Sequence, residues 1–87
     1  MEMTVYNRFG LKFVITEENG KTRVSYGGNS ILLNVNLRVF LKSWYDWRIV
    51  GQFVQDAFSY LSADEREFLQ TGLTPKEFEI VAKEFEK

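Results

Sequence analysis

Four polar residues near the middle of the chain have side chains capable of recognition chemistry: Gln55, Asp56, Arg66 and Glu67. An arginine beside two carboxylates and an amide can bind a small ligand or a charged group of a partner, because guanidinium and carboxylate groups form charge-assisted hydrogen bonds. The competing interpretation is structural, since Asp56 and Arg66 can also form an ion pair that ties two successive helices together. We therefore treat these four residues as a candidate binding cluster.

Catalytic chemistry is restricted by what the chain lacks. It contains no cysteine and no histidine, which excludes thiolate nucleophiles, imidazole bases, disulfides and the usual ligands of zinc, haem and iron–sulfur clusters. Oxygen ligands for Mg²⁺ or Ca²⁺ remain, but no EF-hand spacing is present. Acid pairs for glycosidase-type catalysis would come from Asp56, Asp64, Glu65 and Glu67, whose spacing is typical of solvated helix surfaces. We expect no enzyme, no cofactor and no bound metal.

The second group of candidate binding residues is aromatic. Trp44 and Trp47 belong to a dense run of large rings, which are Phe40, Trp44, Tyr45, Trp47, Phe53, Phe58 and Tyr60. Tryptophan and tyrosine are enriched at binding hot spots, so this run contains candidates for a face that docks on a host protein or forms a homodimer. Packing in the core of a small domain is the alternative account for most of these rings.

The elements that position these residues begin with an antiparallel meander of three or four strands in residues 1–42. Residues 4–8 and 11–17 are rich in β-formers, and Asn19-Gly20 is typical of a two-residue type I′ hairpin turn. Counting outward from that turn predicts four cross-strand pairs, which are Glu18 with Lys21, Glu17 with Thr22, Ile15 with Val24, and Phe13 with Tyr26. After a second turn at residues 27–30, alternating apolar residues over 31–40 predict a further strand.

The second half, residues 43–87, changes to a helical period. Apolar residues recur at spacings of three and four over residues 44–61 and cover more than half of the circumference, which predicts a long, aromatic-rich helix against the sheet. Ser43 with Asp46 is a candidate cap for its start. Gly51 lies on the apolar side, where it either permits a close backbone approach or breaks the segment into two helices.

Two short helices follow, and each has a clear start. Ser62 and Glu65 have the spacing of a capping box, and Thr71-Gly72 marks the end of that helix. Thr74-Pro75-Lys76-Glu77 repeats the capping box and places proline at the first helical position. The residues that the last helix is expected to bury are Phe78, Val81, Ala82 and Phe85.

Length and charge bound the whole molecule. A chain of 87 residues that is 45% apolar suits a single folded domain over residues 1–87 of the α+β class. No apolar run is long enough to span a membrane, and the N-terminus lacks the features of a secretory signal, so we expect a cytoplasmic protein without a membrane partner.

The two halves of the chain differ in charge. Residues 1–43 carry a net charge of +3 and residues 44–87 a net charge of −4. This division suits docking onto another protein.

One segment resembles a known family. Trp47, Gly51, Gln55-Asp56-Ala57-Phe58, Leu61-Ser62, Arg66-Glu67, Leu69, Thr71-Gly72 and Pro75 form a pattern similar to an element of many small phage and prophage proteins. The chain departs from that pattern at Ser59, where the family often has proline. The resemblance implies an origin in a mobile element and residence in the cytoplasm of a bacterial host, and it transfers no catalytic residue.

These observations favour a non-enzymatic protein that binds a host or phage protein, with inhibition of a host system as one form of that role. The alternative is a small dimeric regulator that binds nucleic acid, because the two C-terminal helices have the short, glycine-containing connection of a helix-turn-helix. The last helix, however, carries three lysines and four glutamates, whereas a helix that faces phosphates is expected to be positive. We therefore expect a protein partner and not nucleic acid.

Overall fold

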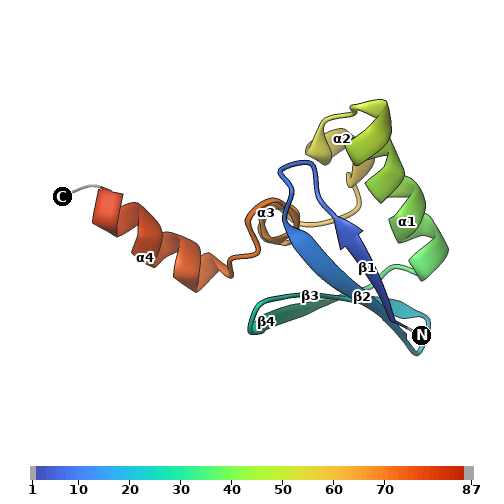
Figure 1. Cartoon of the computed structure of the whole chain (residues 1–87), viewed down its shortest axis with the longest axis horizontal. Coiled ribbons are helices and arrows are strands. Elements are labelled where there is room, and N and C mark those ends of the chain that lie inside the picture. The colour runs from blue at the N-terminus through green and yellow to red at the C-terminus, as the bar shows by residue number, and fades with distance from the viewer. Residues whose placement is uncertain (1, 86–87) are drawn as a thin grey trace.

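A four-stranded antiparallel sheet forms the N-terminal part of the molecule (Figure 1). The computed structural model describes residues 2–85, apart from the side chains of Phe78, Ala82, Glu84 and Phe85. The strands are β1 (Glu2–Tyr6), β2 (Lys12–Glu18), β3 (Lys21–Tyr26) and β4 (Asn29–Leu33). Each strand pairs with the next one in the sequence, which confirms the predicted meander and leaves β1 and β4 at the edges of the sheet.

The predicted hairpin between β2 and β3 is confirmed. Asn19 and Gly20 have φ angles of 51° and 79°, the left-handed values that a type I′ turn requires at both central positions. The register pairs Glu18 with Lys21, Glu17 with Thr22 and Ile15 with Val24, as counted from the turn. The rings of Phe13 and Tyr26 lie 5.0 Å apart between centroids, so the aromatic pair at the far end of the hairpin also meets.

The prediction of a strand over residues 31–40 is wrong beyond Leu33. The chain turns there and enters α1 (Leu37–Tyr45), which places the change from sheet to helix at Leu37. The Oδ1 atom of Asn36 accepts a hydrogen bond of 2.9 Å from the backbone N–H of Val39 and so caps the helix. Leu37, Phe40 and Trp44 follow a helical spacing, and this pattern together with the cap outweighs the strand-like alternation.

Of the two alternatives for residues 44–61, one long helix or a segment broken at Gly51, the structure shows the broken one. After α1 come a short π-helix, η1 (Asp46–Val50), and then α2 (Val54–Ala57). Gly51 has a φ of 94° and ends η1 in the left-handed conformation, which glycine adopts without a steric penalty. The expected cap at Ser43 is wrong because the helix has already begun at Leu37. Ser43 is instead buried and accepts a hydrogen bond of 2.8 Å from the Tyr60 hydroxyl.

Both predicted capping boxes are present, at the starts of α3 (Ala63–Thr71) and α4 (Pro75–Phe85). The Ser62 hydroxyl accepts from the Glu65 N–H at 3.1 Å, and a carboxylate oxygen of Glu65 accepts from the Ser62 N–H at 2.8 Å. The Thr74 hydroxyl accepts from the Glu77 N–H at 3.3 Å, and the Glu77 carboxylate accepts from the Thr74 N–H at 3.1 Å. These local bonds fix where each helix begins.

The last helix, α4, extends away from the sheet and from α1 (Figure 1). The expected burial of Phe78, Ala82 and Phe85 concerns side chains outside the described residues. The expectation that Val81 is buried is wrong, because this side chain is 37% exposed. Helical spacing identifies an apolar face, but it does not say whether another element covers that face.

The core lies between one face of the sheet and the helices. Its buried residues are Phe13, Ile15, Val24 and Leu33 from the strands, and Phe40, Trp44, Trp47, Ala57, Phe58, Leu61, Phe68 and Leu69 from the helical half. The large rings meet edge to face or at a tilt, as in the Trp44–Trp47 pair with 5.4 Å between centroids. This aromatic packing fixes the position of α1 and η1 relative to the sheet.

Candidate functional site

The two candidate tryptophans lie in the core. Trp44 is 5% exposed and Trp47 is 2% exposed, and the rings of both pack against Phe58 with centroid distances of 6.4 and 6.1 Å. Both rings therefore pack in the core and expose little surface. Trp44 also joins two elements, because its indole N–H donates a hydrogen bond of 3.0 Å to the backbone carbonyl of Tyr6. That bond ties α1 to the C-terminal end of β1.

The four described residues of the candidate polar cluster form no hydrogen bond or ion pair with one another. Gln55 and Asp56 are exposed on α2, whereas the Arg66 guanidinium donates to the backbone carbonyls of Leu61 and Phe58, at 2.5 and 3.4 Å. Among the described side chains, the ion pairs are those of Arg23 with Glu18 and Lys42 with Asp46, so the proposed Asp56–Arg66 pair is not formed.

The last member of that cluster, Glu67, accepts a long hydrogen bond of 3.5 Å from the side-chain amide of Gln70 on its own helix. Its contact is local to α3, whereas Arg66 links α3 to the segment between α2 and α3 through the carbonyls of Phe58 and Leu61. The structure therefore does not join the four predicted residues through direct contacts.

A groove of about 300 Å³ lies between β1 and the α1–η1 segment. Its lining residues are Thr4, Val5 and Tyr6 from β1, and Leu41, Trp44, Tyr45, Arg48 and Ile49 from α1 and η1. We call this feature the β1–α1 groove. Most of its lining is apolar, and the guanidinium of Arg48 is the one charged group among these residues.

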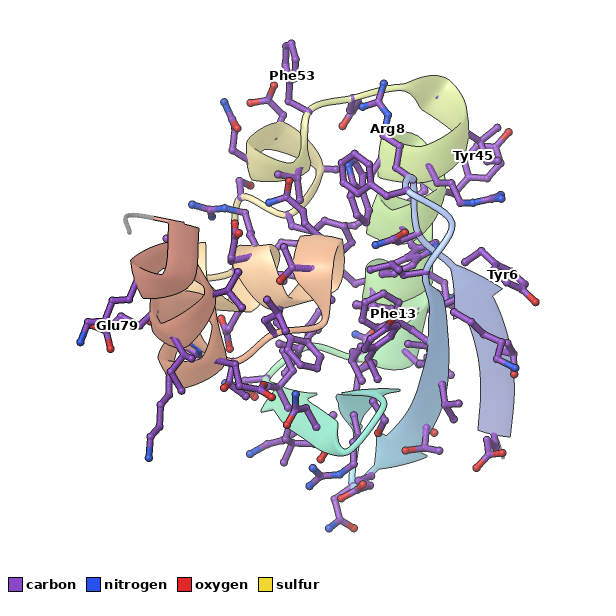
Figure 2. The ribbon with its side chains drawn as sticks, turned by 60° about the vertical axis from the view of Figure 1, so that its left-hand side comes forward. Tyr6, Arg8, Phe13, Tyr45, Phe53 and Glu79 are labelled. Atoms are coloured by element: carbon purple, nitrogen blue, oxygen red, sulfur yellow. The ribbon has the colours of Figure 1, made fainter. Side chains whose placement is uncertain are left out.

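Three side chains of the β1–α1 groove present apolar surface to solvent. Tyr6 is 49% exposed, Tyr45 is 54% exposed and Ile49 is 56% exposed. Figure 2 shows Tyr6 and Tyr45 projecting outward on the same side of the molecule, Tyr6 from β1 and Tyr45 from the end of α1. Contiguous exposed apolar side chains of this kind mark interaction surfaces more often than isolated ones do. The groove is therefore the candidate site.

The dense aromatic run of the sequence is divided between core and surface. Phe40, Trp44, Trp47 and Phe58 are buried, whereas Tyr45, Phe53 and Tyr60 are exposed. The residue types of this run favour the two tryptophans as binding residues over Tyr45, and the sequence does not indicate Tyr6 or Ile49. The available signal was helical phase, since Tyr45 and Ile49 are four residues apart and lie off the buried stripe that contains Phe40, Trp44 and Trp47.

The π-helical turn of η1 shapes one wall of the groove. The backbone N–H groups of Gly51 and Gln52 both reach the carbonyl of Asp46, the second at 3.0 Å. A π-helix holds one more residue per hydrogen-bonded turn than an α-helix, and such turns occur frequently at functional sites. Trp47 is buried beneath this turn, whereas Ile49 and Val50 are exposed on it.

Titration of side chains is perturbed outside the groove. Burial raises the pKa of Tyr60, and the hydrogen bond with Ser43 opposes this shift in part. Hydrogen bonds from the backbone N–H and hydroxyl of Thr74, with a further one from Asn29, lower the pKa of Glu77. The hydrogen bond to Glu18 raises the pKa of Arg23. These groups belong to a tertiary contact, a helix cap and a strand pair, and none of them lines the groove.

The lining of the β1–α1 groove combines aromatic and aliphatic side chains with one guanidinium. Among the side chains that the structure describes, no three carboxylates come close enough together to hold a metal ion. None of the described helices has the length and apolar character to cross a membrane. Comparison of the chain with protein-family models, curated proteins and solved structures gave no match.

Proposed function

We propose that this protein is non-enzymatic and acts by binding another protein, and that the β1–α1 groove is its docking face. The observation that carries the proposal is the exposure of Tyr6, Tyr45 and Ile49 around a groove whose floor includes the buried ring of Trp44. A rigid floor with large, exposed side chains at its rim is the arrangement expected of an interface hot spot.

The resemblance of residues 45–78 to an element of phage and prophage proteins suggests where this binding takes place. We propose an accessory protein of a phage or prophage that works in the cytoplasm of a bacterial host. The partner is then a host or phage protein, and inhibition of a host system is a natural consequence of occupying that partner's surface. The division of charge between the two halves of the chain supports docking onto another protein surface.

A second candidate function is a dimeric regulator that binds nucleic acid. The observation in its favour is that the exposed side chains of Arg8 and Arg48 accompany exposed tyrosines, a combination that single-stranded nucleic acid also uses. The net charge of −1 and the mixed charges of α4 favour the protein partner.

The experiment that tests the proposal is affinity capture from a bacterial lysate with matched variants. Tyr45→Ala removes an exposed ring from the groove, whereas Ile80→Ala removes an exposed apolar side chain from α4 and serves as the control. We expect the wild type and Ile80→Ala to retain the same stoichiometric protein and Tyr45→Ala to lose it. Isothermal titration with the purified partner should then show at least about tenfold weaker binding for Tyr45→Ala.

Two results would count against this assignment. Equal capture of the partner by wild type and Tyr45→Ala would place docking elsewhere on the surface. Retention of single-stranded DNA that falls steeply with salt concentration would instead favour the nucleic-acid regulator.

A further inference from the structure

We infer that the β1–α1 groove receives an extended, acidic segment of the partner, which adds as a short strand to the outer edge of β1. This inference rests on the proposed function and specifies the chemistry of the occupant. It is carried by three features of the groove: the direction of the β1 backbone groups, the apolar wall beside them and the sign of the charge around them.

The direction of the backbone groups follows from two hydrogen bonds at the end of β1. The backbone N–H of Asn7 donates to the Leu11 carbonyl across the turn at 2.9 Å, so this N–H points toward the β2 side. The Tyr6 carbonyl, on the other side of the same peptide unit, accepts from Trp44 at 3.0 Å. Successive residues of a strand direct their backbone N–H and C=O groups to opposite sides. The backbone groups of Glu2, Thr4 and Tyr6 therefore point to the outer edge of β1, away from β2.

The outward groups of β1 offer a template for an added strand. The Tyr6 carbonyl is already bonded to Trp44, which leaves the N–H and carbonyl of Thr4 and the N–H of Tyr6 directed to the outer edge. Thr4 and Tyr6 both line the groove. Edge strands readily pair with an extended segment of another chain, and main-chain hydrogen bonds then supply affinity while alternate side chains supply specificity.

The α1–η1 segment supplies an apolar wall next to this edge. Leu41, Tyr45 and Ile49 lie four residues apart along the segment and all line the groove. An occupant in strand conformation directs every second side chain to the same face. We therefore assign its groove-facing positions to aliphatic or aromatic residues, which the wall formed by Leu41, Tyr45 and Ile49 can cover.

The charge around the groove selects an acidic occupant. Arg48 is the charged residue among the eight that line the groove. Arg38 is exposed on α1 and Arg8 in the turn that follows β1, against the one exposed carboxylate of β1, which is that of Glu2. Asp46, on the same segment, is already paired with Lys42 through two oxygens at 2.8 and 2.6 Å. Carboxylates on the occupant would complement these guanidinium groups and would speed its association.

A second copy of this chain is a poor occupant of the groove. It would add its own β1, Glu2–Tyr6, whose apolar side chains Met3 and Val5 already pack against the core of their own subunit. Those side chains are then not free to cover the wall formed by Leu41, Tyr45 and Ile49. The occupant is accordingly a different protein.

The test is a selection of random ten-residue peptides on the purified wild-type protein, with Tyr45→Ala as the counter-selection. We expect the enriched peptides to carry aspartate or glutamate and to alternate apolar and polar residues. Hydrogen exchange followed by NMR should show slower exchange of the Thr4 and Tyr6 amides when such a peptide is bound. Arg48→Glu should weaken the same peptide by about tenfold or more.

A matched pair at Thr4 tests the backbone contact directly. Thr4→Pro removes the outward N–H at a position where an edge strand tolerates proline, whereas Thr4→Val keeps that N–H and a similar shape. We expect about a tenfold loss of peptide affinity for Thr4→Pro and little change for Thr4→Val, since one intermolecular hydrogen bond is lost. Circular dichroism verifies that both variants are folded.

The outcomes separate this inference from the proposed function. Peptides that depend on Tyr45 but are basic or helical, or that leave the Thr4 amide exchange unchanged, would overturn strand addition and leave groove docking intact. A dimer in sedimentation equilibrium that Tyr45→Ala weakens would overturn it in favour of a second copy. Tight binding of oligo-dT through Tyr45 would overturn it in favour of nucleic acid, and with it the proposed function.

Discussion

Asn7 connects the two halves of the molecule through a single buried side chain. Its amide donates to the backbone carbonyls of Leu69 and Gln70 in α3, both at 3.0 Å, and its carbonyl oxygen accepts from the N–H groups of Phe9 and Leu11, both at 2.9 Å. The side chain thus bonds to backbone groups of its own turn and of a helix more than sixty residues away. Buried polar groups that are fully bonded in this way are costly to disturb.

Asn7→Ala should therefore destabilise the protein strongly. The substitution removes all four hydrogen bonds and leaves buried backbone groups without a partner, so we expect the free energy of unfolding to fall by about 2–4 kcal/mol. Urea denaturation followed by tryptophan fluorescence measures this change. The control is Asn34→Ala at an exposed position, which should change stability by less than about 0.5 kcal/mol. Equal effects of the two substitutions would contradict the bridging role of Asn7.

We expect Tyr60 to make the stability of the fold sensitive to alkaline pH. Its pKa is raised in the folded protein, mainly by burial, so the phenol holds its proton more tightly in the folded than in the unfolded chain. The stabilisation is therefore fully present below the unfolded pKa of about 10, and it is lost as the pH rises through the higher folded value.

The measurement is urea denaturation of wild type and Tyr60→Phe across that range of pH. We expect the wild type to lose stability more steeply than Tyr60→Phe above about pH 10, because the variant lacks the titrating group. The rest of the chain is identical in the two proteins, so the difference between the two profiles reports on Tyr60. Parallel pH profiles would show that the Tyr60 hydroxyl is not perturbed by its site.

The groove residues show how far residue types alone predict a binding site. The aromatic run from Phe40 to Tyr60 indicated a region with both core and surface rings, but ring type alone favoured the two tryptophans. The exposed members were set by helical phase and by the position of β1, which brings Tyr6 beside Tyr45. Contacts between elements distant in sequence carry no local signal, so neither this groove nor the Asn7 bridge could be predicted.

At the scale of elements, the features that were predicted correctly depend on local chemistry. The Asn19-Gly20 turn, the two capping boxes and the end of α3 at Gly72 each involve residues within a few positions of one another. The error over residues 31–40 has a physical cause, because apolar residues there satisfy both a strand and a helix period. Asn36 was the deciding signal, since asparagine is a favoured N-cap residue.

Gly72 ends α3 and also brings the backbone at the end of that helix into close contact with the sheet. It has a φ of 72°, and a Cβ atom at this position would lie 2.3 Å from the ring of Tyr26 in β3. Any side chain would therefore meet both a backbone penalty and a direct clash. The close approach explains why glycine occupies the start of the connection between α3 and α4.

Gly72→Ala should consequently cost about 2–4 kcal/mol of folding free energy, from the left-handed backbone together with overpacking against Tyr26. Gly28→Ala is the matched control, because its backbone is not left-handed and nothing lies within 4 Å of the added Cβ. Thermal denaturation of both variants compares them. A melting temperature for Gly72→Ala close to that of Gly28→Ala would show that the Tyr26 ring moves aside at little cost.

At the scale of the whole molecule, the fold divides into a packed body and a projecting helix. The longest dimension is 43 Å, against 26 and 22 Å for the other two, and α4 extends along it away from α1 (Figure 1). The described buried residues all precede Leu73. The side chain of Asn29, at the start of β4, donates to the Gly72 carbonyl at 3.3 Å and to the Glu77 carboxylate at 2.5 Å, which links β4 to the start of α4.

Removal of residues 75–87 should therefore leave the body folded. The described core lies between Phe13 and Leu69, and the Asn7 bridge and the Gly72 contact are both retained. We expect cooperative urea unfolding with a loss of no more than about 1–2 kcal/mol, mainly from the Asn29–Glu77 bond and the apolar surface of α4. The truncated protein should still bind the partner captured by the full chain, because every residue that lines the β1–α1 groove lies before Val50. Loss of cooperative unfolding would show that α4 is part of the core, whereas a folded but inactive truncation would place the docking face on α4.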